Sequence, residues 1–164
     1  MKYSKLEKNS IANGTGIRCV LWVSGCSVCC KGCHNPQTWD FDCGKMFDIE
    51  AIQIICEELK KPYIAGLTLS GGHPLEPENI EVCTCLCMYL KKRFPEKTIW
   101  LYTGWQWEEV SHMEIVKYID VVVDGQYIEK QRDLSLKFRG SHNQRIIDVQ
   151  KSIANKMIVL LENY

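Results

Sequence analysis

The sequence predicts an α/β fold in which helices cover a mainly parallel sheet. Short apolar runs alternate along the chain with longer segments whose apolar residues recur at helical spacing. Glycine or a small polar residue closes most of these runs, which is typical of strands buried on both faces. We therefore expect βαβ units with right-handed crossovers that form an open or partial (incomplete) parallel β/α barrel. A chain of 164 residues, 46% of them hydrophobic, is expected to form one domain over residues 1–164.

Strands and helices are expected to alternate in order. Residues 18–24 (RCVLWVS) form a near-continuous apolar run and are the first expected strand. A helix is expected at 48–60, because isoleucines recur there on one helical face and Asp48 is a suitable N-cap. The next strand is expected at 65–70, where a pair of glycines ends it. The remaining expected elements are helices at 78–93 and 108–118, strands at 98–103 and 120–124, a run at 144–149 compatible with a fifth strand, and a C-terminal helix.

Charge and hydropathy exclude several classes of protein. Basic and acidic residues each number 20, so the chain has no basic footprint for nucleic acid. No apolar run approaches the roughly 18 residues that a membrane-spanning helix needs. Residues 1–10 are polar and contain lysines, unlike a secretory signal. We expect a cytoplasmic protein that binds neither nucleic acid nor a membrane.

Cysteine is the outlier in the composition, with ten residues. In a reducing cytosol, clustered cysteines bind metal or carry out redox chemistry more often than they form disulfides. Cys26, Cys30 and Cys33 follow the first expected strand with the spacing C-x3-C-x2-C. Three thiolates on one tight loop cannot by themselves complete a four-ligand zinc site. They can bind three irons of a cubane cluster and leave the fourth iron open for another ligand.

Zinc is the alternative metal for this loop. A zinc site would take its fourth ligand from Cys29, His34 or Cys43. Cys29 is adjacent to Cys30, so we expect the Cys29 side chain to point away from a cluster.

Three further cysteines, Cys83, Cys85 and Cys87, fall inside the second expected helix. Cys83 and Cys87 share one face of that helix and Cys85 points elsewhere, which is a poor geometry for a metal site. We expect buried cysteines that pack as small apolar residues, and we interpret Cys43 and Cys56 as structural too. A single cluster is therefore expected.

The cysteine spacing after a first strand resembles that of the radical S-adenosylmethionine (SAM) enzymes. The resemblance is strongest to the activating proteins of anaerobic ribonucleoside-triphosphate reductases, and it extends to about Arg145. The cluster and glycine motifs are common to the superfamily, whereas the N-terminal glycine stretch and the Arg-Gly-Ser segment are more specific to the reductase activators. The matching stretches are residues 13–18, 24–33, 35–39, 69–75, 99–104, 122–125, 139–141 and 143–144.

The resemblance implies a partial barrel of the radical SAM type with one [4Fe-4S] cluster and SAM as cofactors. Cys26, Cys30 and Cys33 would bind the cluster, and the amino and carboxylate groups of SAM would bind the open iron. The turn at Gly71 and Gly72 would receive the SAM amino group, with Gly32 and His34 on the adenine side. Asp124 would contact the ribose or the methionine end of SAM, or would instead cap the next turn. The expected cofactor-binding residues are Gly32, Cys33, His34, Gly71, Gly72 and Asp124.

Three further positions carry open interpretations. His73 departs from the family pattern, which commonly has Asp or Glu there to suit the SAM amino group. Only the glycine backbone is therefore expected to make that contact. Arg18 could bind a carboxylate or could be a solvated arginine at a strand edge. The polar loop at 139–143 could cover the site, contact a partner or be a plain surface loop.

The resemblance implies an activase that works by radical chemistry. One-electron cleavage of SAM would give methionine and a 5′-deoxyadenosyl radical. This radical would take a Cα hydrogen from a glycine of the large subunit of anaerobic ribonucleoside-triphosphate reductase and leave a glycyl radical there. Flavodoxin or ferredoxin would donate the electron. The alternatives are an activase of another glycyl radical enzyme, a short radical SAM synthase and, more remotely, a non-enzymatic zinc-binding module.

Overall fold

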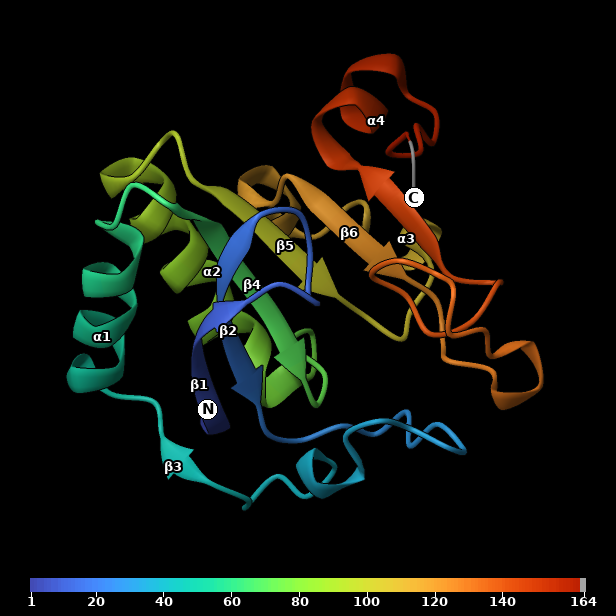
Figure 1. Cartoon of the computed structure of the whole chain (residues 1–164), viewed down its shortest axis with the longest axis horizontal. Coiled ribbons are helices and arrows are strands. Elements are labelled where there is room, and N and C mark those ends of the chain that lie inside the picture. Colours follow the sequence, from blue (N-terminus) through green and yellow to red (C-terminus); the bar gives the residue numbers. More distant parts are fainter. Residues whose placement is uncertain (163–164) are drawn as a thin grey trace.

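A seven-stranded sheet forms the centre of the molecule (Figure 1). The structure is a computed structural model, and it describes residues 1–162. The strand order is β3-β1-β2-β4-β5-β6-β7, and β3 and β7 end the sheet without pairing to each other, so the sheet is open. The strands are β1 (Lys2–Ser10), β2 (Ile17–Val23), β3 (Lys45–Met46), β4 (Ile64–Gly71), β5 (Thr98–Tyr102), β6 (Val121–Asp124) and β7 (Arg145–Asp148).

The two longest helices connect the parallel strands, as βαβ units require. Helix α1 begins after Asp48, whose carboxylate accepts a hydrogen bond from the Ala51 backbone N–H at 3.0 Å, which confirms the expected N-cap. The helices are α1 (Ile49–Leu59), α2 (Pro77–Arg93), α3 (Trp107–Val110) and α4 (Val149–Asn155), with 3-10 turns η1 (Pro36–Thr38), η2 (Glu114–Tyr118) and η3 (Glu129–Gln131).

The hydrophobic core lies on both faces of the sheet, and β5 shows how the pleat divides it. Ile99 and Leu101 pack into the larger cluster, together with buried residues of α1 and α2. Trp100 points to the opposite face and packs with Val123 and Ile146. Because successive side chains of a strand alternate between faces, this near-continuous apolar run is buried on both sides.

The α/β class is confirmed, and the sheet is mixed rather than purely parallel. Strands β2, β4, β5 and β6 are parallel to one another. The sequence did not predict β1, which pairs antiparallel with β2, or the short β3 beside it. Lysines and serines dominate β1, and most of its residues are only half buried, so it lacks the apolar run that marked the other strands. The expected fifth strand is present as β7, but it runs antiparallel to β6.

The helix expected at 108–118 is broken into α3 and η2. Trp107 and Val116 are both buried in the core, at 7% and 2% exposure. On one straight helix these two residues, nine positions apart, would lie on opposite sides. The turn between α3 and η2 lets both side chains face the core.

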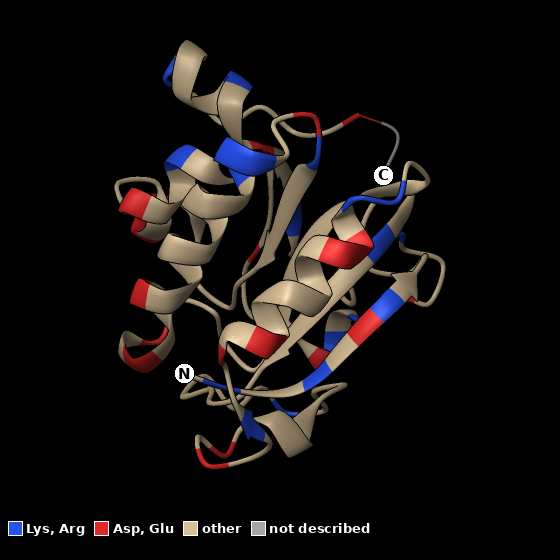
Figure 2. Ribbon diagram, turned by 90° about the vertical axis from the view of Figure 1, so that its left-hand side faces the viewer, with Lys and Arg blue, Asp and Glu red and all other residues tan. Residues whose placement is uncertain are grey.

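Acidic and basic residues are interspersed along the helices and strands of the ribbon in Figure 2. This distribution agrees with the formal net charge of zero. Among residues 1–162, every helix is too short or too polar to cross a lipid bilayer.

Arg18 at the start of β2 is fully buried, which corrects both sequence interpretations of this residue. Its Nε donates to Thr68 Oγ1 at 2.8 Å, and its Nη2 donates to the carbonyls of Leu67 and Thr98 at 2.7 and 2.9 Å. Nη1 donates to Thr98 Oγ1 and to the Thr15 carbonyl. Burial lowers the pKa of Arg18 to about 10, so the side chain stays charged at neutral pH. All these acceptors are neutral, and the guanidinium ties β2 to β4 and β5.

Replacing Arg18 with lysine should lower the free energy of unfolding by about 2–4 kcal/mol, because an ammonium group cannot satisfy so many fixed acceptors and leaves buried carbonyls unpaired. Urea denaturation monitored by circular dichroism measures this change. The matched control is Arg93→Lys at an exposed position of α2, which should stay within about 0.5 kcal/mol of the wild type. Equal stability of the two variants would contradict a structural role for Arg18.

Candidate functional site

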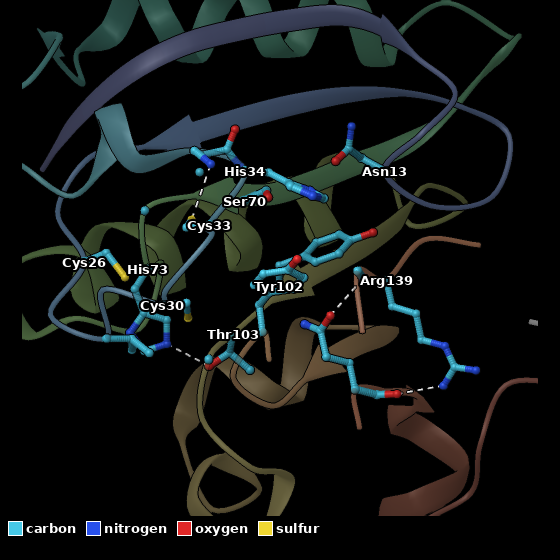
Figure 3. Close-up of a pocket in the computed structure, with 18 of the residues that line it drawn as sticks. Asn13, Cys26, Cys30, Cys33, His34, Ser70, His73, Tyr102, Thr103 and Arg139 are labelled. Atoms are coloured by element: carbon cyan, nitrogen blue, oxygen red, sulfur yellow. Dashed lines mark hydrogen bonds between the residues drawn. The ribbon is translucent and has the colours of Figure 1, made fainter. Parts of the chain in front are cut away.

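A cavity of about 440 Å³ lies where the parallel strands β4, β5 and β6 end (Figure 3). The carboxyl ends of parallel strands are where α/β folds place their ligands. Figure 3 shows Cys26, Cys30 and Cys33 around one end of the cavity and Arg139 toward the other. The wall of the cavity is formed by the strand ends and by the loops that follow β1, β2 and β6. The residues on this wall are Ala12, Asn13, Trp22, Cys26, Val28, Cys30, Cys33, His34, Asn35, Trp39, Ser70, Gly71, Gly72, His73, Tyr102, Thr103, Gly104, Gly125, Tyr127, Leu136, Phe138, Arg139, Gly140 and Gln144.

The cysteine loop (residues 24–39) leaves β2 and folds back along the cavity. Gly25, its second residue, has φ +92°, and a Cβ there would lie 2.3 Å from the Phe41 ring, so only glycine fits. Backbone N–H groups of Gly25 and Cys26 donate to the carbonyls of Thr38 and Trp39 at 2.8 and 3.1 Å. The start and the end of the cysteine loop are thereby fastened together, which holds its middle against the cavity.

All three cysteines of the C-x3-C-x2-C motif line the cavity, whereas Cys29 does not. Cys29 is exposed, has a left-handed φ of +45°, and donates its thiol hydrogen to the Cys26 carbonyl at 3.2 Å. Three thiols of one loop facing one cavity are a suitable donor set for a [4Fe-4S] cluster with one open iron.

Of the other candidate zinc ligands, Cys43 is absent from the cavity wall, whereas His34 lines the cavity and packs its ring against Tyr127 with centroids 5.5 Å apart. Within residues 1–162, no three His, Cys, Asp or Glu side chains are grouped around a position for one shared metal ion. A cubane cluster does not need such a group, because each of its cysteines binds a different iron. In α2, Cys83 and Cys87 share a buried face, as their helical spacing predicted. Cys85 lies on the other side of the helix and is exposed, which corrects the expectation that all three cysteines are buried.

The glycine turn (Gly71 and Gly72) ends β4 and lies directly against the cysteine loop. Gly71 has φ +100°, and a Cβ on it would lie 2.7 Å from the Val23 carbonyl. A Cβ on Gly72 would lie 2.5 Å from the Gly25 carbonyl, which is too close for any side chain. Both glycines are therefore required by close packing as well as by their place on the cavity wall.

His73 lines the cavity with a side chain that is only 1% exposed. Its Nδ1 lies 3.1 Å from Glu76 Oε1 and its Nε2 lies 2.7 Å from Thr103 Oγ1. A carboxylate can only accept, so Nδ1 carries the proton and Nε2 accepts from the threonine hydroxyl. Burial lowers the pKa of His73, and the smaller opposing effect of Glu76 does not cancel it. His73 is therefore neutral near pH 7, with both ring nitrogens in use.

Two of the expected cofactor residues, Gly32 and Asp124, lie outside the cavity wall. The carboxylate of Asp124 is fully buried, and it accepts hydrogen bonds from the Trp107 backbone N–H at 2.8 Å and from Arg145 Nε at 3.1 Å. Asp124 therefore joins β6 to α3 and β7, and its carboxylate lies outside the cavity in which SAM was expected. Gly32 faces Glu129, whose carboxylate oxygen would lie 2.9 Å from an added Cβ.

The loop after β6 lines the cavity with Arg139, Gly140 and Gln144, and also with three residues that the sequence did not single out, Tyr127, Leu136 and Phe138. Gln144 organises this loop: its Oε1 accepts from the Gly140 backbone N–H at 2.9 Å, and its Nε2 donates to the Gly125 carbonyl at 3.1 Å. The Tyr102 hydroxyl donates to the Phe138 carbonyl at 2.8 Å from the neighbouring strand. Of the interpretations for residues 139–143, the structure supports a loop that forms part of the cavity wall.

The depressed pKa of His73 predicts a pH dependence of stability. In the unfolded chain a histidine takes up a proton near pH 6.5, whereas the folded side chain of His73 does so only at a lower pH. The contribution of neutral His73 to the free energy of unfolding is therefore fully present above about pH 6.5. It is lost as the pH falls from about 6.5 through the lower folded pKa, with a slope of at most about 1.4 kcal/mol per pH unit. Urea denaturation of the wild type and of His73→Gln between about pH 7.5 and pH 5.5 should give a flatter profile for the variant.

His112→Gln is the control for that comparison, because His112 is exposed on the turn between α3 and η2. Its profile should run parallel to that of the wild type. A His73→Gln profile as steep as the wild-type one would contradict the buried neutral state.

Comparisons with known proteins support an iron–sulfur cluster in this part of the chain. A family model described as a 4Fe-4S single cluster domain matches residues 12–147, a span that contains the cavity and its three cysteines. Similar curated proteins carry the name anaerobic ribonucleoside-triphosphate reductase-activating protein. The one from Enterobacteria phage T4 is 43% identical over 146 residues, which cover 89% of this chain and 93% of the relative.

Cellular organisms encode similar relatives with the same name. The protein from Haemophilus influenzae is 43% identical over 150 residues, which cover 89% of this chain and 97% of the relative. The protein from Escherichia coli K12 is 38% identical over 148 residues, which cover 88% and 96%. With a [4Fe-4S] domain model that spans most of the fold, this chain belongs to the family of anaerobic ribonucleoside-triphosphate reductase-activating proteins.

Proposed function

We propose that this chain is an iron–sulfur, SAM-dependent activase that installs a glycyl radical on the large subunit of anaerobic ribonucleoside-triphosphate reductase. One observation carries the proposal: the three thiols of one loop and the glycine turn line the same cavity. In this proposal the 164 residues act as a single radical SAM domain, and the open sheet is its incomplete barrel. The family membership and the 4Fe-4S domain support the same function.

Cys26, Cys30 and Cys33 are the proposed iron ligands, because they are the cysteines that line the cavity. When bound, the reduced cluster would supply one electron for cleavage of SAM to methionine and a 5′-deoxyadenosyl radical, and this radical would take the Cα hydrogen atom of the target glycine. The chain contributes by holding SAM beside the cluster and by keeping the reaction out of bulk water.

SAM is proposed to lie along the cavity with its methionine end at the cysteines. Backbone groups of Gly71 and Gly72 are available to its amino group, and both residues lie on the wall. The position that commonly carries an acid in the family is His73 here, so it offers no carboxylate. Both ring nitrogens of His73 already have hydrogen-bond partners, so the contact falls to the glycine backbone. His34 and Tyr127, whose rings face each other, are the proposed contacts on the adenine side.

The partners follow from this chemistry. Each turnover consumes one electron, so a one-electron carrier such as flavodoxin or ferredoxin is the proposed donor. The protein substrate is the large reductase subunit, whose glycine must reach the cavity. We place the reaction in the cytoplasm with that substrate.

The test uses anaerobic protein reconstituted with iron and sulfide, reduced with dithionite and mixed with SAM and the reductase. We expect about four irons per chain, 5′-deoxyadenosine by chromatography, and a glycyl radical signal on the reductase by electron paramagnetic resonance. Single changes of Cys26, Cys30 or Cys33 to serine should abolish 5′-deoxyadenosine formation. Cys29→Ser on the same loop is the matched control and should behave like the wild type, because its thiol lies outside the cavity wall.

Three results would contradict the proposal. Zinc in place of iron would favour a metal-stabilised binding module, and a cluster indifferent to SAM would exclude SAM chemistry. A radical that forms on a different glycyl radical enzyme, but not on the reductase, would assign the chain to that enzyme.

A further inference from the structure

A buried carboxylate, that of the N-cap residue Glu76, links the start of α2 to the cysteine loop. Oε1 of Glu76 accepts a hydrogen bond from the Ser27 backbone N–H at 2.8 Å and another from the Ser27 hydroxyl at 2.7 Å. The same oxygen lies 3.1 Å from His73 Nδ1. Ser27 directly follows Cys26, so the carboxylate fixes the backbone next to a proposed iron ligand.

Asn79, one turn further along α2, fixes the start of the same loop. Its buried amide nitrogen donates to the Ser24 carbonyl at 2.9 Å and to the His73 carbonyl at 3.0 Å. The backbone N–H of His73 donates to the Gly25 carbonyl at 2.7 Å. Residues 24–27 are thus fixed by hydrogen bonds to the start of α2 and to the turn after β4. Glu76 supplies the charged contact among them.

The charge of Glu76 has no cationic counterpart. Glu76 is 4% exposed, and within residues 1–162 its only ion-pair partner is His73. Burial alone would raise the pKa of Glu76, but the hydrogen bonds from Ser27 and His73 outweigh burial and hold this pKa below its usual value. Since His73 is neutral near pH 7, a net negative charge stays buried beside the cysteine loop.

This buried carboxylate lies close to a proposed iron ligand. It binds the backbone N–H and the hydroxyl of Ser27, the residue that directly follows Cys26. A negative charge at this place disfavours an extra electron on a cluster bound there. In a low-dielectric site such an effect is much stronger than it would be in water.

We propose that Glu76 is a positioning residue for the cluster: it orients Cys26 through Ser27, and its charge lowers the reduction potential of the bound cluster. This inference rests on the proposed function, because it requires a [4Fe-4S] cluster at Cys26, Cys30 and Cys33. The one-electron couple concerned is the reduction of the cluster by dithionite or by the physiological carrier. A lower potential makes the reduced cluster a stronger donor to SAM, so Glu76 promotes the step on which radical formation depends.

The experiment is a potentiometric titration of the reconstituted protein, followed by electron paramagnetic resonance of the reduced cluster. Glu76→Gln keeps the size of the side chain and a carbonyl that can accept from Ser27, but it removes the charge. Its midpoint potential should shift to a more positive value than that of the wild type. Ser27→Ala removes the hydroxyl contact and keeps the charge, so its potential should stay near the wild-type value.

Glu78→Gln is the matched control, because Glu78 lies in the first turn of α2, two residues after Glu76, but is exposed. This substitution removes one negative charge that solvent already screens. The midpoint potential of the Glu78→Gln protein should therefore equal that of the wild type. Glu76→Asp keeps the charge on a shorter side chain. It should keep a potential close to the wild-type value and should lose iron faster on gel filtration.

Each outcome decides the inference. A wild-type potential in a Glu76→Gln protein that holds its cluster would overturn the inference and leave the proposed function intact. If Glu76→Gln loses its cluster while Glu76→Asp retains it, the positioning role of the charged contact is supported. A wild-type protein that takes up zinc but no iron would overturn the proposed function, and this inference with it.

Discussion

The site depends on the close approach of the cysteine loop to the glycine turn, where the His73 N–H donates to the Gly25 carbonyl at 2.7 Å. This hydrogen bond joins the turn after β4 to the start of the cysteine loop after β2, and these two strands are parallel neighbours in the sheet. The contact is possible only because Gly72 has no Cβ, which would lie 2.5 Å from that carbonyl. Together with the contacts of Asn79 and Glu76, it holds the cysteine loop against the glycine turn, so that the thiols and this turn line the same cavity.

Two buried charges without opposite partners lie in different regions of the fold. Arg18 binds neutral hydroxyls and carbonyls from β4, β5 and the preceding loop. Glu76 accepts from neutral donors at the carboxyl-terminal edge, where the cavity lies. Burying a charge is costly unless hydrogen bonds replace the lost water, and both side chains meet that condition. Arg18 thereby fixes the strands, and Glu76 fixes the cysteine loop.

The sequence was informative wherever a local pattern determines the structure. The apolar runs predicted β2, β4, β5 and β6, because strands buried on both faces need apolar residues at every position. The cysteine spacing identified the loop on the cavity wall. The direction of β7 and the existence of β1 were not predictable, because strand pairing is a long-range property. The roles of Asp124 and Gln144 were hidden for the same reason, since their partners lie on other elements.

The central claim is that three thiols of one loop leave one iron open for SAM. Electron–nuclear double resonance of the reduced protein tests it directly, with SAM labelled by ¹⁵N at the amino group and by ¹⁷O at the carboxylate. We expect hyperfine couplings from both labels, large enough to require direct bonds to one iron. Signals from distant labels only, or no coupling at all, would show that the fourth iron is closed by another ligand and would contradict the proposed binding of SAM.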